Sequence, residues 1–370
     1  MTFAALSDVG SDAKIYLRPD RFVDSPIGQD GTVARLAGGL LWHGGYELIA
    51  VSGGKRTRRA FVPVEAIDDA VAALPDAQAH QVAELIKRLS VPRSPLRLGE
   101  RTIRLDQPQV AGILNMTPDS FSDGGSGDAD AGFAMAAMGA ALIDVGGEST
   151  RPDAEPIWEG DEVKRVVPVI ERLAASGVAI SIDTRKAAVM EAALAAGAGI
   201  VNDVSALLFD DRAIEVVVRA GCPVILMHHS GSARSLHDRP MSADPLIEVY
   251  DWLEARVRAV EAAGVPRDRI IVDPGIGFGK TVQENLALLN GLALFQGFGC
   301  AVMLGASRKR LIGALSNEAP VEDRLGGSVA LALFGAARGA QLLRVHDVAE
   351  TVQAVRVWRG LRDQALTASV

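Results

Sequence analysis

The sequence predicts an α/β protein whose main part is a (β/α)8 TIM barrel, and two observations support this fold class. Eight short apolar runs between residues 110 and 343 each end in polar side chains. Between them lie longer stretches in which apolar residues recur at three- and four-residue steps, as one buried helix face requires. Short strands that alternate with helices pair in parallel, because each strand is followed by a crossover. An open doubly wound sheet is the alternative, but its strongest cue, Gly-x-Gly-x-x-Gly opening the first helix, is absent from the first unit.

The elements of the barrel follow from these two patterns in chain order. The expected strands are residues 110–114, 142–145, 180–182, 199–201, 224–227, 270–272, 301–305 and 342–343. The expected helices are roughly 129–141, 160–176, 186–197, 210–221, 245–264, 281–294, 321–339 and 348–366. In 160–176, for example, Val163, Val166 and Ile170 fall on one helix face.

Residues 1–95 precede the barrel and form an extension, expected to be a small α+β unit of unknown role. Strands are expected at 16–19, 32–36 and 46–51, short helices at 65–73 and 76–90, and a solvated loop at the basic cluster 56–59. Pro92 and Pro95 mark a linker. Residues 96–105 then alternate around Gly99 and Glu100 as a hairpin does. The barrel domain is therefore expected to span 96–370.

Polar side chains at the carboxyl ends of the strands are the candidate functional residues, because barrel enzymes place their chemistry there. They are Asn115, Thr150, Arg151, Asp183, Asn202, Asp203, His228, Asp273, Lys309, Arg344 and His346. Any one of them can instead cap a helix or satisfy a strand-end amide. Eight consecutive strands with polar ends of mixed charge favour a functional site for the set as a whole.

Composition excludes several other classes of protein. The chain has 370 residues, a formal net charge of −8 and no basic tract, which argues against a nucleic-acid partner. The amino terminus lacks the features of a signal peptide, and no stretch is expected to span a membrane. Cys222 and Cys300 are expected to be buried hydrophobes, so a cytoplasmic protein is the default expectation.

Two motifs resemble sites that their context does not support. Residues 275–281 look like a phosphate-binding loop, but Pro274 stands where the Walker motif needs glycine. His228 and His229, with His237 nearby, suggest zinc. Adjacent residues on a strand point to opposite faces, however, so the first two cannot easily ligate one ion.

Five segments resemble, in order, the signature blocks of the dihydropteroate synthases: residues 112–125, 144–152, 273–280, 307–309 and 344–347. The resemblance covers roughly residues 96–366. It implies a transferase that joins 6-hydroxymethyl-7,8-dihydropterin diphosphate to 4-aminobenzoate, releasing diphosphate, in folate synthesis. It further implies a hairpin that plugs the barrel bottom, Mg2+ as cofactor, and a homodimer packed through barrel helices.

The resemblance also assigns roles to individual residues. The catalytic residues would be Asp183, Lys309, Arg344 and His346. The pterin diphosphate would be bound by these four together with Thr150, Asn202 and Asp273; the 4-aminobenzoate by Phe121, Thr150, Pro152 and Ser307; and Mg2+ by Asn115. The chemistry agrees, because a neutral aromatic amine needs no strong base. The difficult step is the SN1-like loss of diphosphate, which cationic donors and a carboxylate beside the new cation would ease.

Two other functions remain open from the sequence. A methyltetrahydrofolate:corrinoid methyltransferase would share the pterin-reading acids but would not need the Arg344-x-His346 pair. A non-catalytic pterin-binding protein predicts loss of the loop and anion residues, all of which are present. The chain also departs from the family at Asp153, where glycine is frequent, and in the loop after Met227 and His228, which diverges from the family pattern.

Overall fold

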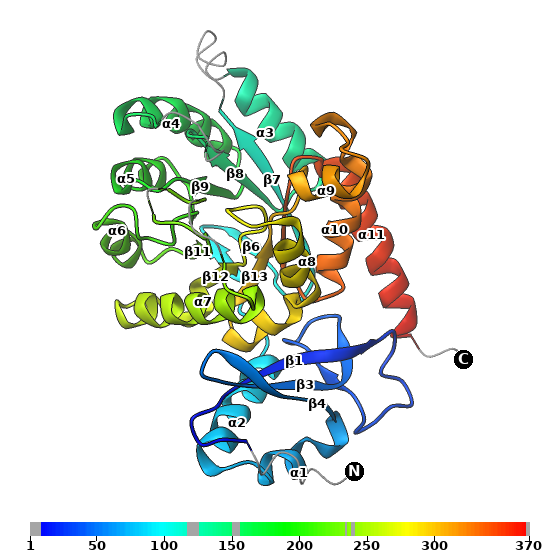
Figure 1. Cartoon of the computed structure of the whole chain (residues 1–370). Helices are drawn as coiled ribbons and strands as arrows, with labels where there is room; N and C mark the ends of the chain where they lie inside the picture. The colour runs from blue at the N-terminus through cyan, green and yellow to red at the C-terminus, as the bar shows by residue number, and fades with distance from the viewer. Residues whose placement is uncertain (1–8, 117–125, 150–155, 234, 238–240, 368–370) are drawn as a thin grey trace.

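The computed structural model describes residues 9–116, 126–149, 156–233, 235–237 and 241–367, and its main feature is a closed barrel of parallel strands (Figure 1). The strands are β7 (Gln109–Asn115), β8 (Leu142–Gly146), β9 (Ile180–Asp183), β10 (Ile200–Asp203), β11 (Val224–Met227), β12 (Ile270–Asp273), β13 (Ala301–Leu304) and β14 (Leu342–Val345). Each pairs with the next, and β14 returns to β7 with Arg344 beside Ala111. The predicted barrel is confirmed.

The outer layer consists of helices that follow the strands. These are α3 (Ser126–Met138), α4 (Glu159–Ala175), α5 (Ala187–Ala195), α6 (Ala213–Ala220), α7 (Pro245–Ala262), α8 (Val282–Asn290), α9 (Arg310–Leu315), α10 (Leu325–Ala336) and α11 (Val348–Ala365). The predicted helix 281–294 is wrong in its second half. Thr281 and Glu284 form a capping box that starts α8, but Gly291 ends it and a 3-10 helix, η5 (Leu292–Phe298), follows. No described helix has the length and apolar character needed to cross a membrane.

The hairpin β5 (Leu96–Leu98) and β6 (Arg101–Ile103) closes the amino-terminal end of the barrel. Leu96 and Ile103 are buried in one apolar cluster with barrel residues such as Leu142, Ile200 and Leu342. These three lie at the first positions of their strands, which is the end opposite the candidate site. The predicted plug is therefore confirmed.

The extension folds as an antiparallel sheet with two helices, below the barrel in Figure 1. Its strands are β1 (Lys14–Val23), β2 (Ala34–Arg35), β3 (Trp42–Ser52) and β4 (Lys55–Pro63); its helices are α1 (Ile67–Ala72) and α2 (Asp76–Ser90). The loop predicted at Arg56–Arg59 is wrong, because these residues lie within β4. Their polarity misled the prediction: the strand lies at a sheet edge, and Arg56 and Arg59 are exposed.

Both faces of the extension's sheet are covered. Ile15 and Leu48 belong to a core shared with α1 and α2. Tyr16, Ile49 and Val51, which alternate with them, belong to the barrel core instead. The sheet therefore lies between its own helices and the barrel.

Candidate active site

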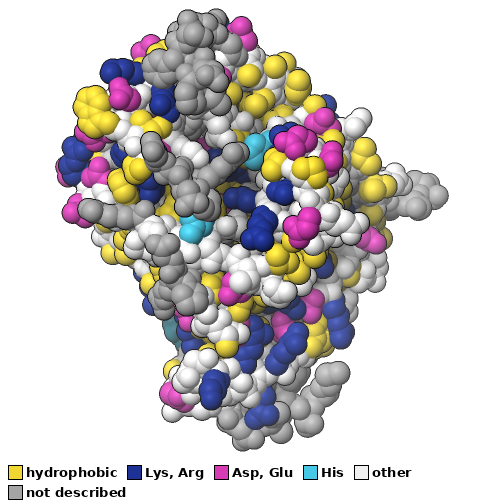
Figure 2. Space-filling view, turned by 45° about the horizontal axis from the view of Figure 1, so that its top comes forward, with side chains coloured by type: hydrophobic (Ala, Val, Ile, Leu, Met, Phe, Trp, Pro, Cys, Tyr) yellow, Lys and Arg dark blue, Asp and Glu magenta, His cyan; other side chains and the backbone are white. Residues whose placement is uncertain are grey.

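The carboxyl ends of the barrel strands meet at the top of Figure 1. Figure 2 turns this end toward the viewer and shows Lys, Arg and His side chains gathered near its centre. Phe121, Thr150, Arg151, Pro152 and Asp153 lie outside the described residues. The other predicted site residues can be located.

Arg344 is the centre of this site. From β14, its Nε donates to Asp144 Oδ2 at 2.5 Å, and one terminal nitrogen donates to Asp183 Oδ2 at 2.6 Å. Asp144 also accepts hydrogen bonds from the Ser181 hydroxyl and from Asn202 Nδ2, the latter at 3.0 Å. Side chains from β8, β9, β10 and β14 thus converge on one guanidinium–carboxylate network.

Burial sets the protonation behaviour of these groups. Desolvation raises the pKa of Asp183, with Arg344 opposing the shift and Asp144 adding to it. Burial alone would lower the pKa of Arg344, but Asp144 and Asp183 together raise it above its ordinary value. The guanidinium is therefore a permanent cation that holds the two carboxylates together.

Asn202 faces the site with an unused acceptor. Its side chain is buried, and within the described part of the chain its Oδ1 has no hydrogen-bond partner. Buried polar atoms are nearly always paired, so this oxygen requires a ligand or a water molecule. Asp273 lies at the end of β12, accepts from the Gly275 amide at 2.7 Å, and has a pKa raised by burial.

Lys309, Ser307 and His346 form the rim nearest β13 and β14. The Lys309 amine lies 4.2 Å from the centre of the Phe278 ring. Ser307 Oγ lies 3.0 Å from His346 Nδ1 and accepts from the His346 amide at 3.2 Å. Burial and then Arg344 lower the pKa of His346 to about 4, so its imidazole is neutral near pH 7.

Asn115 is the last residue of β7 and is exposed at the barrel mouth. A Cβ added to Gly146 would lie 3.5 Å both from Asn115 Oδ1 and from Asp183 Cβ. Glycine at this position therefore leaves the space between the amide and the carboxylate open to a ligand.

Asp203 and His228 from the candidate set have other surroundings. Asp203 accepts from the Ser205 amide and hydroxyl and from the Leu207 amide, so it shapes the loop after β10. His228 is buried with its ring 5.0 Å from that of Trp252 on α7. Lys280, in the segment that resembles a phosphate loop, donates to the carbonyls of Gly275, Phe278 and His228.

Two groups in or beside the site were missed from the sequence. Asp144 is a carboxylate inside an apolar strand, which is costly to bury and could have been noticed. The second group is a buried ion network beside it. Lys186 Nζ contacts Glu148 Oε1 at 3.1 Å, Glu162 Oε2 at 2.6 Å and the Ile157 carbonyl at 2.5 Å. This network ties together the ends of the segment between Glu148 and Ile157.

Comparison with known proteins identifies the class of this barrel. The family described as "Pterin binding enzyme" matches residues 111–346, so the chain is a pterin-binding enzyme. Dihydropteroate synthase of Neisseria meningitidis serogroup B is 44% identical over 274 residues, spanning 71% of this chain and 96% of the relative. The Escherichia coli K12 enzyme is 43% identical over 262 residues, spanning 69% and 92%. Within the family, the chain belongs to the dihydropteroate synthases.

Solved structures agree with this assignment. Xanthomonas albilineans dihydropteroate synthase with 4-aminobenzoic acid superimposes with a TM-score of 0.68 at 46% identity, over 74% of this chain and 99% of the other. The same enzyme in complex with 7,8-dihydropteroate gives 0.65 at 43% identity, over 74% and 100%. About a quarter of the present chain lies outside these matches.

Proposed function

We propose that the barrel mouth joins 6-hydroxymethyl-7,8-dihydropterin diphosphate to 4-aminobenzoate, as the dihydropteroate synthases do, and releases diphosphate. The observation that carries the proposal is Arg344 held between Asp144 and Asp183 at the strand ends. It puts a fixed cation and a carboxylate side by side. The reaction needs a cation to stabilise the leaving diphosphate and a carboxylate to stabilise the cation left on the pterin methylene group.

The pterin would be read by Asp183, Asn202 and Asp273. Its aminopyrimidinone edge carries adjacent donors and acceptors, which carboxylates and an amide can match in pairs. The unpaired Asn202 Oδ1 and the buried Asp273 suit this role. Lys309 would lie over the pterin, with Phe278 behind its amine.

The chemical step would be dissociative, with loss of diphosphate before the amine attacks. Arg344 and Lys309 would stabilise the departing anion, and neutral His346 would donate a hydrogen bond to it. The Asp183 carboxylate would stabilise the cation on the methylene group. The amine needs no base before it attacks, and the proton that its nitrogen loses once the C–N bond has formed can pass to the released diphosphate or to water.

Mg2+ would bind through Asn115. Among the described residues no group of three or more His, Cys, Asp or Glu could hold a metal ion, so a cage made only of protein is not expected there. Mg2+ prefers oxygen ligands and usually combines one or two from protein with water and substrate phosphates. The exposed amide of Asn115 fits that pattern. When bound, the ion would neutralise charge on the diphosphate.

The remaining assignments are also proposals. Phe121, Thr150, Pro152 and Ser307 would bind 4-aminobenzoate. We propose a cytoplasmic enzyme with a division at residue 95 between the extension and the barrel domain. We further propose a homodimer through the outer face of α11, where Val357 and Leu361 lie one turn apart and are 62% and 68% exposed.

A coupled assay for diphosphate release tests the function. The purified full chain, Mg2+ and the pterin diphosphate are incubated with and without 4-aminobenzoate, alongside Arg344→Ala and the control Arg219→Ala on the outer helix α6. We expect release and dihydropteroate formation that require 4-aminobenzoate, collapse in Arg344→Ala and persist in the control. Binding of the pterin without product would refute the synthase and favour a corrinoid methyltransferase or a non-catalytic binder.

A further inference from the structure

The extension contacts one flank of α7 through a row of ion pairs. Arg56 donates to both oxygens of Asp244, the residue before the helix, at 2.5 and 2.8 Å. Lys14 contacts Asp251 Oδ1 at 2.5 Å and Glu254 Oε2 at 2.6 Å. The three acids are spaced by seven and three residues, so they share one face of the helix. The extension thus binds α7 at its start and at its middle.

Aromatic packing reinforces this contact. Tyr16 from β1 donates its hydroxyl to Asp251 at 2.7 Å, and its ring meets that of Tyr250 edge-on at 5.2 Å. Both tyrosines are buried. The contact therefore combines desolvated aromatic area with charge, which makes it firmer than a set of surface ion pairs.

A second flank of α7 holds two loops at the catalytic end of the barrel. Arg256 donates to the carbonyls of Ala206 and Leu207, in the loop after β10, at 2.6 and 3.2 Å. Trp252 packs edge-on against the rings of His228 and His229, just after β11, at 5.0 and 5.4 Å. One rigid helix thus links the extension to these two loops.

The loop after β10 requires such support because its backbone is strained. Ala206 and Leu207 are consecutive non-glycine residues with φ of +55° and +61°. This left-handed conformation costs roughly 1–2 kcal/mol per residue and persists only where the surroundings impose it. Asp203 accepts a hydrogen bond from the Leu207 amide, and Arg256 on α7 donates one to the Ala206 carbonyl. Both side chains therefore hold the loop in this conformation. Asn202, the proposed pterin reader, lies near the end of β10, the strand that leads into this turn.

We infer that the extension is a built-in brace that positions α7, and through Arg256 and Trp252 the loops beside Asn202 and His228. Lys14 and Arg56 are positioning residues in this arrangement. Arg256 transmits the position of α7 to the loop after β10. The consequence for pterin affinity rests on the function proposed above, whereas the effect on the loop does not.

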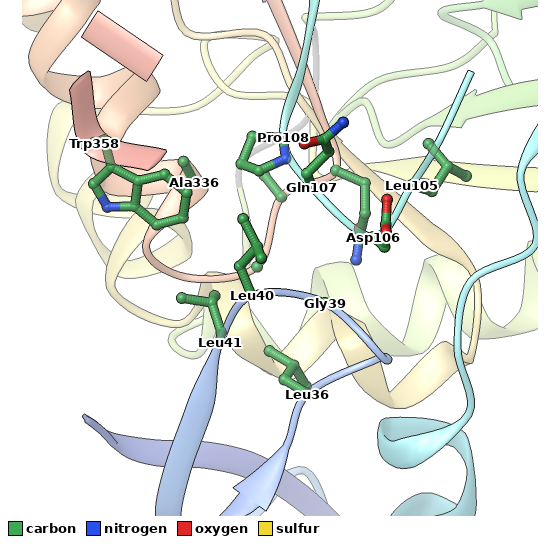
Figure 3. Close-up of a pocket in the computed structure, with 13 residues that line it drawn as sticks. Leu36, Gly39, Leu40, Leu41, Leu105, Asp106, Gln107, Pro108, Ala336 and Trp358 are labelled. Atoms are coloured by element: carbon green, nitrogen blue, oxygen red, sulfur yellow. The ribbon is translucent and has the colours of Figure 1, made fainter. Parts of the chain in front are cut away.

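The extension also contacts α11, on another side of the barrel. Arg362 on α11 contacts Asp24 and the carbonyls of Val23 and Leu40. Beside it lies a small apolar pocket, and Figure 3 shows Leu40, Leu41 and Trp358 around it. The ion-paired contact with α7 is the one that leads, through Arg256 and Trp252, to the loops after β10 and β11.

The test compares two double variants of the full chain. Lys14→Gln with Arg56→Gln removes the cations that hold α7, and Lys55→Gln with Arg58→Gln removes the same charge from the same sheet away from that contact. Hydrogen exchange of the Leu207 and Phe209 amides, which bond to Asp203 and Ser205, reports on the loop without any substrate. Titration calorimetry with the pterin diphosphate and Mg2+ measures the pterin affinity, to which Asn202 would contribute.

In the first double variant we expect exchange at Leu207 and Phe209 to accelerate and pterin affinity to fall by roughly 2- to 30-fold, as remote positioning residues typically do. The control should match the wild type. Arg256→Gln should reproduce the faster exchange with the extension still attached. If the first variant loses thermal stability but keeps wild-type exchange, the extension merely packs and the inference is wrong. Faster exchange in a chain without synthase activity would support the brace and refute only the proposed reaction.

Discussion

Asp144 connects four strands through its carboxylate. It accepts from Ser181, Asn202 and Arg344, all donors, and it is only 1% exposed. Asp144→Asn keeps the shape but turns an amide NH2 toward one set of these donors. Disrupting a buried charged hydrogen bond costs about 2 kcal/mol or more, which is roughly 30-fold in binding. We therefore expect pterin affinity, measured by calorimetry, to fall by that factor. Asp161→Asn, an exposed acid on α4, should have no effect, and equal affinities in both variants would contradict the role of Asp144.

Asp144 also shows what sequence reasoning reaches at this scale. Residues at strand ends, such as Asp183 and Arg344, could be predicted because barrel enzymes place their active-site residues at the carboxyl ends of the strands. Asp144 could not be recognised by that rule, since it precedes the strand end. The pairing of Arg344 with both acids joins residues 200 and 161 positions apart and depends on side-chain direction, which no local pattern encodes.

Lys186 provides a separate test of buried charge. It is the cation between Glu148 and Glu162, whose side chains are 4% and 0% exposed. Lys186→Met leaves these acids short of a partner, which typically costs 3–5 kcal/mol. We expect a loss of about that size in the free energy of unfolding, measured by urea denaturation. Lys164→Met, which removes an exposed ion pair with Asp161, should cost less than about 1 kcal/mol. Similar losses for both would show that the network is not stabilising.

Among the elements, β3 holds a histidine that makes the extension sensitive to acid. His43 is buried on β3, and burial lowers its pKa from 6.5 to about 4. The unfolded chain takes up a proton below pH 6.5 while the folded chain does not. Stability is therefore lost as the pH falls from about 6.5 toward 4, by about 1.4 kcal/mol per pH unit from this group.

His43→Gln isolates that effect. Glutamine can still donate to the Gly45 carbonyl, which His43 Nδ1 contacts at 3.0 Å, but it does not titrate. The other histidines and the buried acids titrate equally in both chains, so they cancel in the difference. Urea denaturation at pH 7.5, 6 and 5 should show the wild type losing stability faster than the variant. Parallel curves would mean that His43 takes up its proton as readily in the folded chain as in the unfolded chain.

The elements themselves were predictable where burial made a pattern. All eight barrel strands and the plug hairpin follow from apolar runs and turn residues. β4 could not be predicted in this way. Arg56, Arg58 and Arg59 lie in an edge strand that has few buried residues, so it shows no apolar run. Its turn at Gly53 and Gly54, with φ of +55° and +73°, was the missed cue for a hairpin.

At the scale of the whole molecule, the relation of the extension to the barrel was out of reach of the sequence. The contact depends on Lys14 and Arg56 meeting acids about 190 to 240 residues away. In the sequence, Lys14 and Arg56 cannot be told from other surface charges. Only the folded chain brings them to the acids of α7. Sequence patterns describe faces of elements, and only tertiary packing decides which faces meet.

Assembly gives the final prediction. Val357 and Leu361 present exposed apolar area on α11, and Val218 does so on α6, on the opposite side of the barrel in Figure 1. If two copies pair through α11, Leu361→Asp places a charge in the interface. We expect association to weaken by about 2 kcal/mol or more, roughly 30-fold, in sedimentation equilibrium. Val218→Asp should leave the dimer intact.

The same variant separates assembly from catalysis. Asp144, Asp183 and Arg344 all belong to one chain and contact one another directly, so monomeric Leu361→Asp should still bind the pterin diphosphate. A wild-type chain that sediments as a monomer, or a Leu361→Asp variant that remains dimeric, would exclude the α11 interface. A monomer that has lost pterin binding would instead show that the barrel mouth depends on the second copy.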